Sequence, residues 1–240
     1  MIPHIIHKIY ISHDFNLPEK LEPESLKEAH DSWQMLNPEY TVKYWSHAAC
    51  LDYLRHEFED QIYYETFKSL LPYSYKCDFF RFCIMYKEGG YYSDWKQKCI
   101  VPLDEINDNN YDWISCLDTG NGYAKYYQCM GTGFFGCIPK HPVLKTAIEK
   151  IIENVHRKFY GSSCLDPTGP FLFGNAFLQN KNEMKHYRLG NFDWDNYFSF
   201  QKNDEVIKAV EHKCEGVAKD QNWKNGNNYA DMWAERRVYL

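Results

Sequence analysis

The sequence predicts a single α/β domain with a mostly parallel central sheet covered by helices. Two observations predict this fold class. Segments with the periodicity of strands alternate along the chain with segments that have the periodicity of helices. No Pro-, Gly- or Ser-rich linker divides the 240 residues, a length that fits one large domain. We therefore expect one domain over residues 1–240.

The elements follow from the spacing of apolar residues and from residues that start or stop a helix. The expected strands cover residues 5–12, 41–45, 91–96, 111–117 and 132–138. The expected helices cover residues 23–36, 48–70 as a pair, 73–87 and 143–155. Ligands of such sheets bind beyond the carboxyl ends of the strands. Residues 10–13 and 92–98 are expected at or beyond such ends.

Composition excludes several classes of protein. The formal charge of −6 argues against a nucleic-acid surface, which needs an excess of clustered Lys and Arg. No apolar run approaches the ~18–20 residues of a membrane span, and residues 1–4 do not resemble the start of a signal peptide. The nine cysteines form no CxxC pair and suggest reduced thiols. We expect a cytoplasmic protein, with peripheral attachment to the inner membrane face as an alternative.

One block of sequence places several charged residues close together. Asp78 and Arg81 lie three residues apart, on one face of the helix expected over 73–87. Gly89-Gly90 supplies residues that adopt positive φ and end the helix. In the strand expected next, the period of two puts four side chains on one side. They are Tyr92, Asp94, Lys96 and Lys98.

This block resembles the catalytic core of the family 32 glycosyltransferases, DXD sugar transferases similar to the catalytic domain of the clostridial glucosylating toxins. The family pattern is Asp, two residues, Arg, an apolar stretch, Gly-Gly, one residue, Tyr, one residue and Asp-X-Asp. Every element matches except the last Asp, where Lys96 stands. The resemblance implies a GT-A fold.

Further segments match the family in order and spacing. They are residues 2–10, Trp33, residues 37–45, residues 102–104, Gly136, Pro139, residues 141–142 and residues 168–170. The resemblance is weakest from Lys219 to Tyr239, where the usual final Ser-X-Trp is missing.

The resemblance implies roles for the residues of the block. Asp78 and Arg81 are expected to hold the hydroxyls of the donor sugar, or else to form a surface pair. Asp94 is expected to contact ribose, sugar or a metal, with Tyr92 beside it; the alternative is a salt bridge to Lys96 or Arg81. Tyr10 is expected to stack on the nucleotide base, or else to be a core aromatic. Trp95 points to the other face of the expected strand, which indicates core packing.

Lys96 changes the expected mechanism. A nucleoside diphosphate that leaves carries negative charge, which a divalent metal held by two carboxylates commonly neutralises. An ammonium repels a cation and has no lone pair to offer it. We expect transfer that requires no cofactor, with Lys96, helped by Lys98, at the diphosphate. The alternatives are an inactive relative, or a shifted Mn²⁺ or Mg²⁺ site that uses Asp94 and downstream ligands.

Two later segments complete the expected site. Residues 219–240 are expected to act as a lid, with Asn222, Trp223 and Lys224 near the donor; the alternative is an exposed turn. Thr168, Gly169 and Pro170 are expected on the acceptor side, or else as a turn that opens a helix. Three weaker polar candidates are expected to be structural, namely Asp118, His141 and Asp166.

The resemblance implies retaining transfer of a hexose from a nucleotide sugar, with UDP as the expected nucleotide, to a saccharide or glycolipid acceptor. No catalytic base is assigned. The alternatives are a binding protein for sugar nucleotides without transfer activity, or a transferase that modifies proteins.

Overall fold

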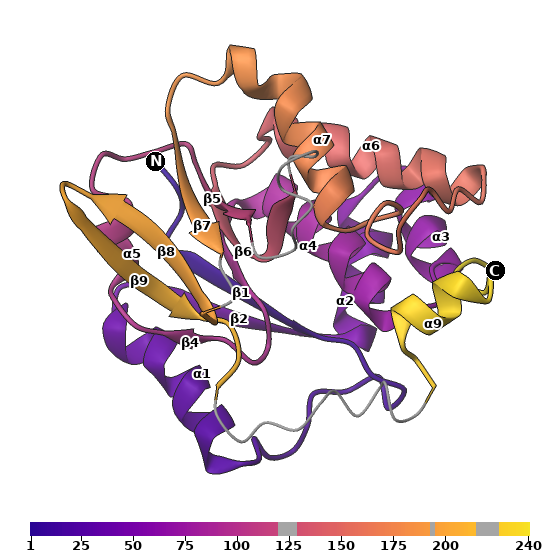
Figure 1. Cartoon of the computed structure of the whole chain (residues 1–240). Coiled ribbons are helices and arrows are strands. Elements are labelled where there is room, and N and C mark those ends of the chain that lie inside the picture. Colours follow the sequence, from indigo (N-terminus) through magenta and orange to yellow (C-terminus); the bar gives the residue numbers. More distant parts are fainter. Residues whose placement is uncertain (120–128, 193–194, 215–225) are drawn as a thin grey trace.

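A mixed sheet runs through the molecule in the computed structural model, which describes residues 1–119, 129–192, 195–214 and 226–240. In these ranges the strands follow the order β2-β1-β3-β6-β5-β7-β8-β9-β4 (Figure 1). Their bounds are β1 Ile5–Tyr10, β2 Thr41–Ser46, β3 Gly90–Ser93, β4 Lys98–Cys99, β5 Trp113–Asp118, β6 Met130–Cys137, β7 Tyr187–Phe192, β8 Tyr197–Lys202 and β9 Glu205–Glu211. The predicted α/β class is confirmed.

The sequence predicted a mostly parallel sheet, and this prediction is wrong. Only the pairs β1/β2, β1/β3 and β5/β7 are parallel, and the other pairs are antiparallel. The main reason lies in the C-terminal part, where no strands were predicted. There, β8 and β9 form a hairpin joined by Asn203 and Asp204, with Asn203 at φ 54°. A two-residue turn of this kind can join only antiparallel strands.

The predicted helices are confirmed within a few residues. The observed helices in the described ranges are α1 Glu24–Leu36, α2 His47–Glu57, α3 Ile62–Ser69, α4 Tyr73–Glu88, α5 Leu103–Ile106, α6 Pro142–His156, α7 Pro170–Asn180, a 3₁₀ turn Lys181–Glu183 and α9 Tyr229–Ala234. Of these, α5, the 3₁₀ turn and α9 were not predicted, and α7 matches the alternative in which residues 168–170 open a helix. Proline lies at the first turn of α6 and α7, where its missing N–H leaves no helical bond unmade. Within the described ranges, no helix combines the length and the apolar character needed to cross a bilayer.

Two apolar cores lie on the two faces of the sheet. Neighbouring residues of one strand are divided between them: Tyr92 and Phe135 join one core, and Tyr91 and Phe134 join the other. The first core is covered by α2, α3, α4, α6 and α7, and the second by α1 and α5 (Figure 1). Burying one aromatic ring of this size contributes on the order of 1.5–3 kcal/mol, so both faces stabilise the sheet.

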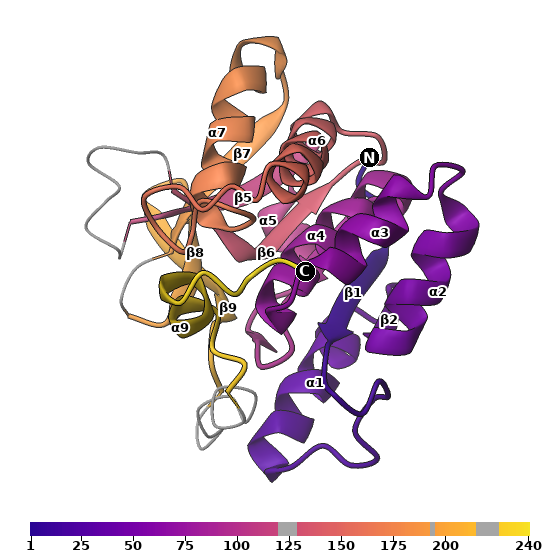
Figure 2. The same cartoon turned by 90° about the vertical axis from the view of Figure 1, so that its right-hand side faces the viewer.

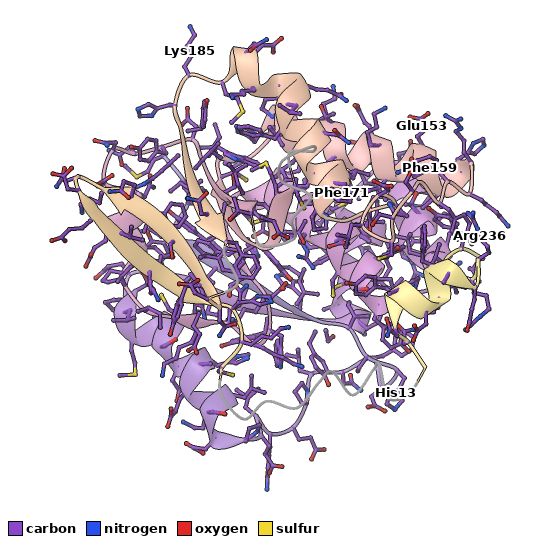
Figure 3. The ribbon with its side chains drawn as sticks, in the orientation of Figure 1. His13, Glu153, Phe159, Phe171, Lys185 and Arg236 are labelled. Atoms are coloured by element: carbon purple, nitrogen blue, oxygen red, sulfur yellow. The ribbon has the colours of Figure 1, made fainter. Side chains whose placement is uncertain are left out.

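The C-terminal end of the chain packs back onto the first core. Leu70 pairs with Tyr239 in an isolated bridge, and α9 lies beside α4 (Figure 2). In Figure 3, Arg236 lies close to this end of the molecule, and its guanidinium carbon is 4.4 Å from the centre of the Tyr160 ring. Charged side chains such as Glu153 and Lys185 project outward in the same view. The C-terminal residues 226–240 are therefore part of the packed fold.

Two glycines connect α4 to β3 without an intervening loop. Gly89 has φ 67° and Gly90 has φ 95°, values that L side chains rarely adopt. A Cβ on Gly90 would lie 2.5 Å from the carbonyl oxygen of Ile5 in β1. Both positions therefore require glycine, as predicted, and they fix α4 directly beside the strands that it follows.

The strand predicted over 91–96 is shorter than expected. It ends at Ser93, and residues 94–97 form a turn in which the N–H of Gln97 donates to the carbonyl of Asp94 at 3.2 Å. Lys98 then starts β4, where its register partner is Glu211 of β9. The strand geometry that placed four side chains on one face is wrong, because the backbone reverses between Asp94 and Lys98.

Candidate functional site

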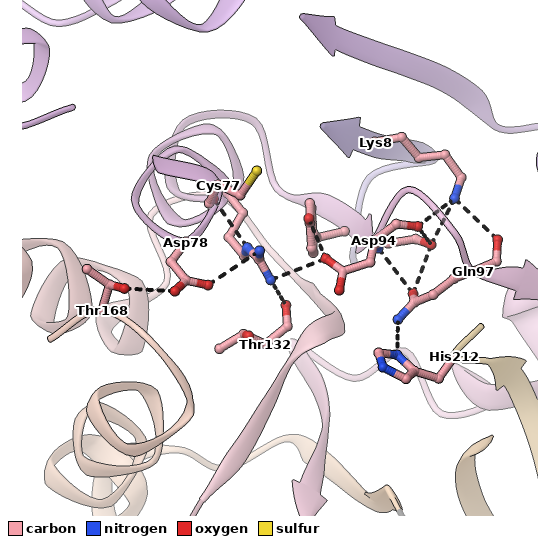
Figure 4. Close-up of polar contacts among 11 residues, drawn as sticks. Lys8, Cys77, Asp78, Asp94, Gln97, Thr132, Thr168 and His212 are labelled. Atoms are coloured by element: carbon pink, nitrogen blue, oxygen red, sulfur yellow. Dashed lines mark hydrogen bonds and ion pairs between the residues drawn. The ribbon is translucent and has the colours of Figure 1, made fainter. Parts of the chain in front are cut away.

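Three charged residues of the predicted block meet where α4 faces the end of β3 (Figure 4). One Nη atom of Arg81 lies 3.3 Å from a carboxylate oxygen of Asp78. The other lies 3.4 Å from a carboxylate oxygen of Asp94. The helical spacing of three residues brings Asp78 and Arg81 together, as predicted. The short Gly89-Gly90 connection brings Asp94 to the same place.

Arg81 is buried and held from several directions. Its Nη1 donates to the carbonyl of Thr132 at 2.6 Å, and its Nε donates to that of Cys77 at 3.2 Å. Its guanidinium carbon lies 4.5 Å from the centre of the Tyr92 ring. Burial opposes the charge, but Tyr92 and the carboxylates of Asp94 and Asp78 outweigh it and raise the pKa of Arg81. Arg81 is therefore a fixed cation between two acids.

Asp78 is buried beside this cation. Its Oδ2 accepts a hydrogen bond of 2.8 Å from the hydroxyl of Thr168. Burial raises the pKa of Asp78 to about 6, although Arg81 and Thr168 both favour the charged form. Asp78 thus changes charge near neutral pH, and when ionised it can accept hydrogen bonds from hydroxyl groups of a ligand.

Asp94 is the more open of the two acids. The hydroxyl of Tyr92 donates to its Oδ1 at 2.7 Å, and about a third of the Asp94 side chain is exposed. Its Oδ2 lies against Gly133 of β6, where an added Cβ would come within 2.9 Å of it. The Asp94 carboxylate is therefore accessible to solvent, while Tyr92 and Gly133 restrict where it can lie.

Tyr10 and Trp95 form an aromatic contact beside the turn. Their ring centres are 4.9 Å apart at 45°, and both residues are partly buried. Trp95 also packs edge-on against His30 and Tyr44, and it adjoins the small apolar cluster of Leu26, Ala29 and Cys214. Trp95 therefore belongs partly to a core, as expected, while the stacking of Tyr10 on a base stays a prediction.

The residues at the DXD position do not fit the usual metal clamp. Lys96 stands on the turn, where its carbonyl accepts from the N–H of Cys214 at 3.1 Å. An ammonium there supplies no lone pair to a cation. In the described ranges, His, Cys, Asp and Glu side chains form no group of three or more that could hold a metal ion.

The predicted acceptor segment opens a helix. Gly169 is the N-cap of α7, and Pro170 is the first residue of that helix. The Thr168 hydroxyl binds Asp78, so this segment touches the side of the site expected to hold the donor sugar. Its role toward an acceptor stays a prediction.

The weaker candidates have structural partners. Asp166 accepts from the backbone N–H groups of Ser162 and Ser163, and His141 stacks on Trp113 at 4.6 Å. Asp118 is buried at the end of β5, and its backbone N–H donates to the carbonyl of Cys129.

The predicted lid lies partly outside the described residues. Asn222, Trp223 and Lys224 are among the residues that the structure does not describe. Asn227 is described, and its side-chain oxygen accepts from the N–H of Tyr73 at 2.8 Å, at the start of α4. The lid role of residues 219–240 stays a prediction.

Sequence reasoning missed the residues that support Asp94 from below. Lys8, Gln97 and Gly133 all contact the turn. The sequence could have indicated a structural role for Lys8. A lysine within an apolar, buried strand needs oxygen atoms that accept its hydrogen bonds. Gln97 and Gly133 gave no signal, since their importance depends on how β6 lies beside the turn.

Known proteins resemble this chain in sequence. The profile described as "Glycosyltransferase sugar-binding region containing DXD motif" matches residues 23–113. The uncharacterized glycosyltransferase L373 of Acanthamoeba polyphaga mimivirus is 26% identical over 180 residues, which are 75% of this chain and 66% of L373. A second relative, HOC1 of Saccharomyces cerevisiae, is 26% identical over 143 residues, which are 55% of this chain and 36% of HOC1. The chain thus spans less than two thirds of each relative's length.

A solved structure shares the fold. The PaToxG glycosyltransferase aligns with a TM-score of 0.51 and 16% identity over 75% of this chain and 70% of that one. This likeness confirms the predicted GT-A fold and leaves substrates open. The matched region, the two relatives and the shared fold show that the chain resembles the DXD-motif glycosyltransferases, and Asp94-Trp95-Lys96 lies within the matched region where the motif is expected.

Proposed function

We propose that this protein transfers a hexose from a nucleotide sugar to a saccharide or glycolipid acceptor with retention of configuration. The observation that carries the proposal is the cluster of Asp78, Arg81 and Asp94, which lies within the family's sugar-binding region. UDP is the nucleotide that the family resemblance favours.

The cluster has the chemistry needed to hold a sugar. Ionised carboxylates accept hydrogen bonds from hydroxyl groups, and such charge-assisted bonds are about twice as strong as neutral ones. Arg81 lies between the two carboxylates, and its own contacts to Thr132 and Cys77 hold it in place. Asp78 and Asp94 would therefore accept hydrogen bonds from neighbouring hydroxyl groups of the donor sugar and hold the sugar in one orientation. A fixed orientation lowers the entropic cost of reaching the transition state.

Lys96 is the proposed cation for the leaving diphosphate. Asp94, which would face the sugar, is only two residues from Lys96 on the same tight turn. An ammonium at this position can neutralise charge that develops on a phosphate oxygen. The structure removes the support for Lys98 as its helper, because Lys98 lies in β4 beyond the turn.

Calorimetric titration with a panel of nucleotide sugars, with and without Mn²⁺, tests the binding part of this proposal. Release of nucleoside diphosphate, measured in excess EDTA, tests the transfer part. We expect binding of one UDP-hexose and turnover that persists in EDTA. If none of the nucleotide sugars binds, the proposal as a whole is refuted. Binding without turnover on any acceptor would instead favour a binding protein that has lost transfer activity.

Two variants test Lys96 directly. Lys96→Ala is expected to lower kcat at least 100-fold, since removal of one group that stabilises a developing charge typically costs 10²–10³-fold. Lys145→Ala, at an exposed lysine of α6, is the control and is expected to keep kcat. Strict dependence of the wild-type enzyme on Mn²⁺ would overturn the role of Lys96 and support a shifted metal site.

A further inference from the structure

Lys8 is a buried cation outside the sugar-facing cluster. It lies in the middle of β1, and its residue is 0% exposed. Burial lowers the pKa of Lys8 to about 7, although the nearby charge of Asp94 opposes this shift. A lysine at such a depth is costly to the fold unless its three N–H donors find acceptors. The position of those acceptors indicates what the residue does.

Among the described residues, the acceptors of Lys8 belong to the turn that carries Asp94 or to Ser93, which directly precedes it (Figure 4). Its Nζ donates to the hydroxyl of Ser93 at 3.1 Å and to the carbonyl of Asp94 at 3.0 Å. It also lies 3.4 Å from the carbonyl of Gln97. The ammonium therefore joins both ends of the turn from beneath. Three contacts to described residues thus engage its donors.

Other buried groups reinforce the same arrangement. The indole N–H of Trp33 donates to the carbonyl of Gln97 at 2.8 Å, and Nζ of Lys8 lies 4.8 Å from the centre of the Trp33 ring. The side-chain oxygen of Gln97 accepts from the Ser93 hydroxyl at 3.0 Å and from the N–H of Asp94 at 3.1 Å. The turn is thus held by hydrogen bonds from its own residue Gln97 and from Lys8 of the neighbouring strand β1.

The contacts of the turn divide into two sets on opposite sides of Asp94. Its backbone carbonyl faces Lys8, and its carboxylate faces Arg81 and Tyr92 (Figure 4). A change of Lys8 would therefore reach the carboxylate through the backbone of the turn and through the loss of a nearby positive charge. Lys96 stands on the same turn and would move with it.

We propose that Lys8 is a positioning residue, whose ammonium holds the turn of residues 94–97 so that Asp94 and Lys96 are correctly placed for the reaction. This inference rests on the proposed function for its effect on catalysis. Its effect on the order of the turn does not depend on that function. The two parts can therefore be measured separately.

Lys8→Met tests the inference, because methionine keeps most of the volume and removes the charge and the donors. Hydrogen–deuterium exchange of residues 93–98 is expected to rise at least 10-fold without any ligand. In turnover, kcat is expected to fall about 10–100-fold with KM changed less, since a misplacement of ~1 Å can cost 10²-fold. Lys8→Arg, which restores a cation and several donors, is expected to recover part of the loss.

Lys76→Met is the matched control. Lys76 is also buried, and its Nζ donates to the backbone carbonyls of Phe67 and Lys68 at the end of α3. We expect this variant to lower Tm while exchange of residues 93–98 and kcat stay as in the wild type. Equal changes in both methionine variants would show that Lys8 acts only through general stability, which overturns the inference.

A gentler variant covers the case in which Lys8→Met does not fold. Ser93→Ala removes one acceptor of Lys8 and the hydrogen bond from the Ser93 hydroxyl to Gln97 but leaves the lysine in place, so exchange at the turn should rise by a smaller factor. Wild-type exchange in Ser93→Ala would overturn the inference. Increased exchange in a protein that binds no nucleotide sugar would support the positioning of the turn and refute the proposed function alone.

Discussion

Gly133 offers the sharpest test of how the site is packed. It lies in β6, and its carbonyl accepts the N–H of Asp94 at 2.9 Å. A Cβ at this position would lie 2.9 Å from Oδ2 of Asp94 and 2.9 Å from Nε2 of Gln97. Gly133→Ala thus places one methyl group against the carboxylate and changes nothing else in chemistry.

The size of the effect follows from these distances. An ordinary contact needs 3.4 Å or more, so the carboxylate of Asp94 must move by about 0.5 Å. A shift of ~1 Å at a reacting group can cost 10²-fold, so we expect kcat to fall roughly 10-fold. The fold should tolerate the change. A side chain pushed off its rotamer costs about 0.5–1.5 kcal/mol, and alanine in place of glycine returns about 0.4–1 kcal/mol.

Steady-state turnover and thermal unfolding together check this prediction. The net change of about 1 kcal/mol or less should keep Tm within ~4 °C of the wild type. Gly131→Ala is the matched control in the same strand, since its Cβ would meet the ring of Phe198 at 3.0 Å, outside the charged cluster. Wild-type kcat in Gly133→Ala, or an equal loss of kcat in Gly131→Ala, would refute the reasoning.

Two further changes test the hydrogen bonds of the acids. In Thr168→Val, Asp78 loses a donor that favours its charged form, so its pKa should rise above the present value of about 6. Under the proposed function, ionised Asp78 is the form that accepts sugar hydroxyls. The acidic side of the pH profile of kcat/KM should therefore move to higher pH. An unchanged acidic side would contradict the role of Thr168 in keeping Asp78 ionised. In Tyr92→Phe, Asp94 loses a hydrogen bond of 2.7 Å, and kcat/KM should fall about 10-fold, since a bond to a charged group contributes ~1.5–3 kcal/mol. A twofold change or less would show that Tyr92 does not orient Asp94.

The sequence predicted best those features that depend on local spacing. The pairing of Asp78 with Arg81, the end of α4 at Gly89 and the start of α6 at Pro142 each follow from residues close in the chain. Local rules apply there because helical geometry fixes which neighbours meet. The same rules found the block that the family profile also matches.

The sequence failed where distant segments decide the conformation. Period-two alternation continued the strand through Lys96, but Lys8 and Gln97 close a turn there instead. No local pattern distinguishes a strand from a turn whose partners come from β1 and from a buried glutamine. The mixed sheet was missed for a related reason, since the β8/β9 hairpin binds β4 only through long-range pairing.

The glycine junction between α4 and β3 has a consequence for how such a site can diverge. It fixes the sugar-facing residues Asp78 and Arg81 on a rigid helix, while Lys96 sits on a separate turn supported by its own buried contacts. Asp94 stands on that turn as well, so under the proposed function the turn would serve both the sugar and the leaving group, whereas the helix would serve the sugar alone. A substitution at position 96 would then change how the leaving charge is stabilised while Asp78 and Arg81 keep their places on α4.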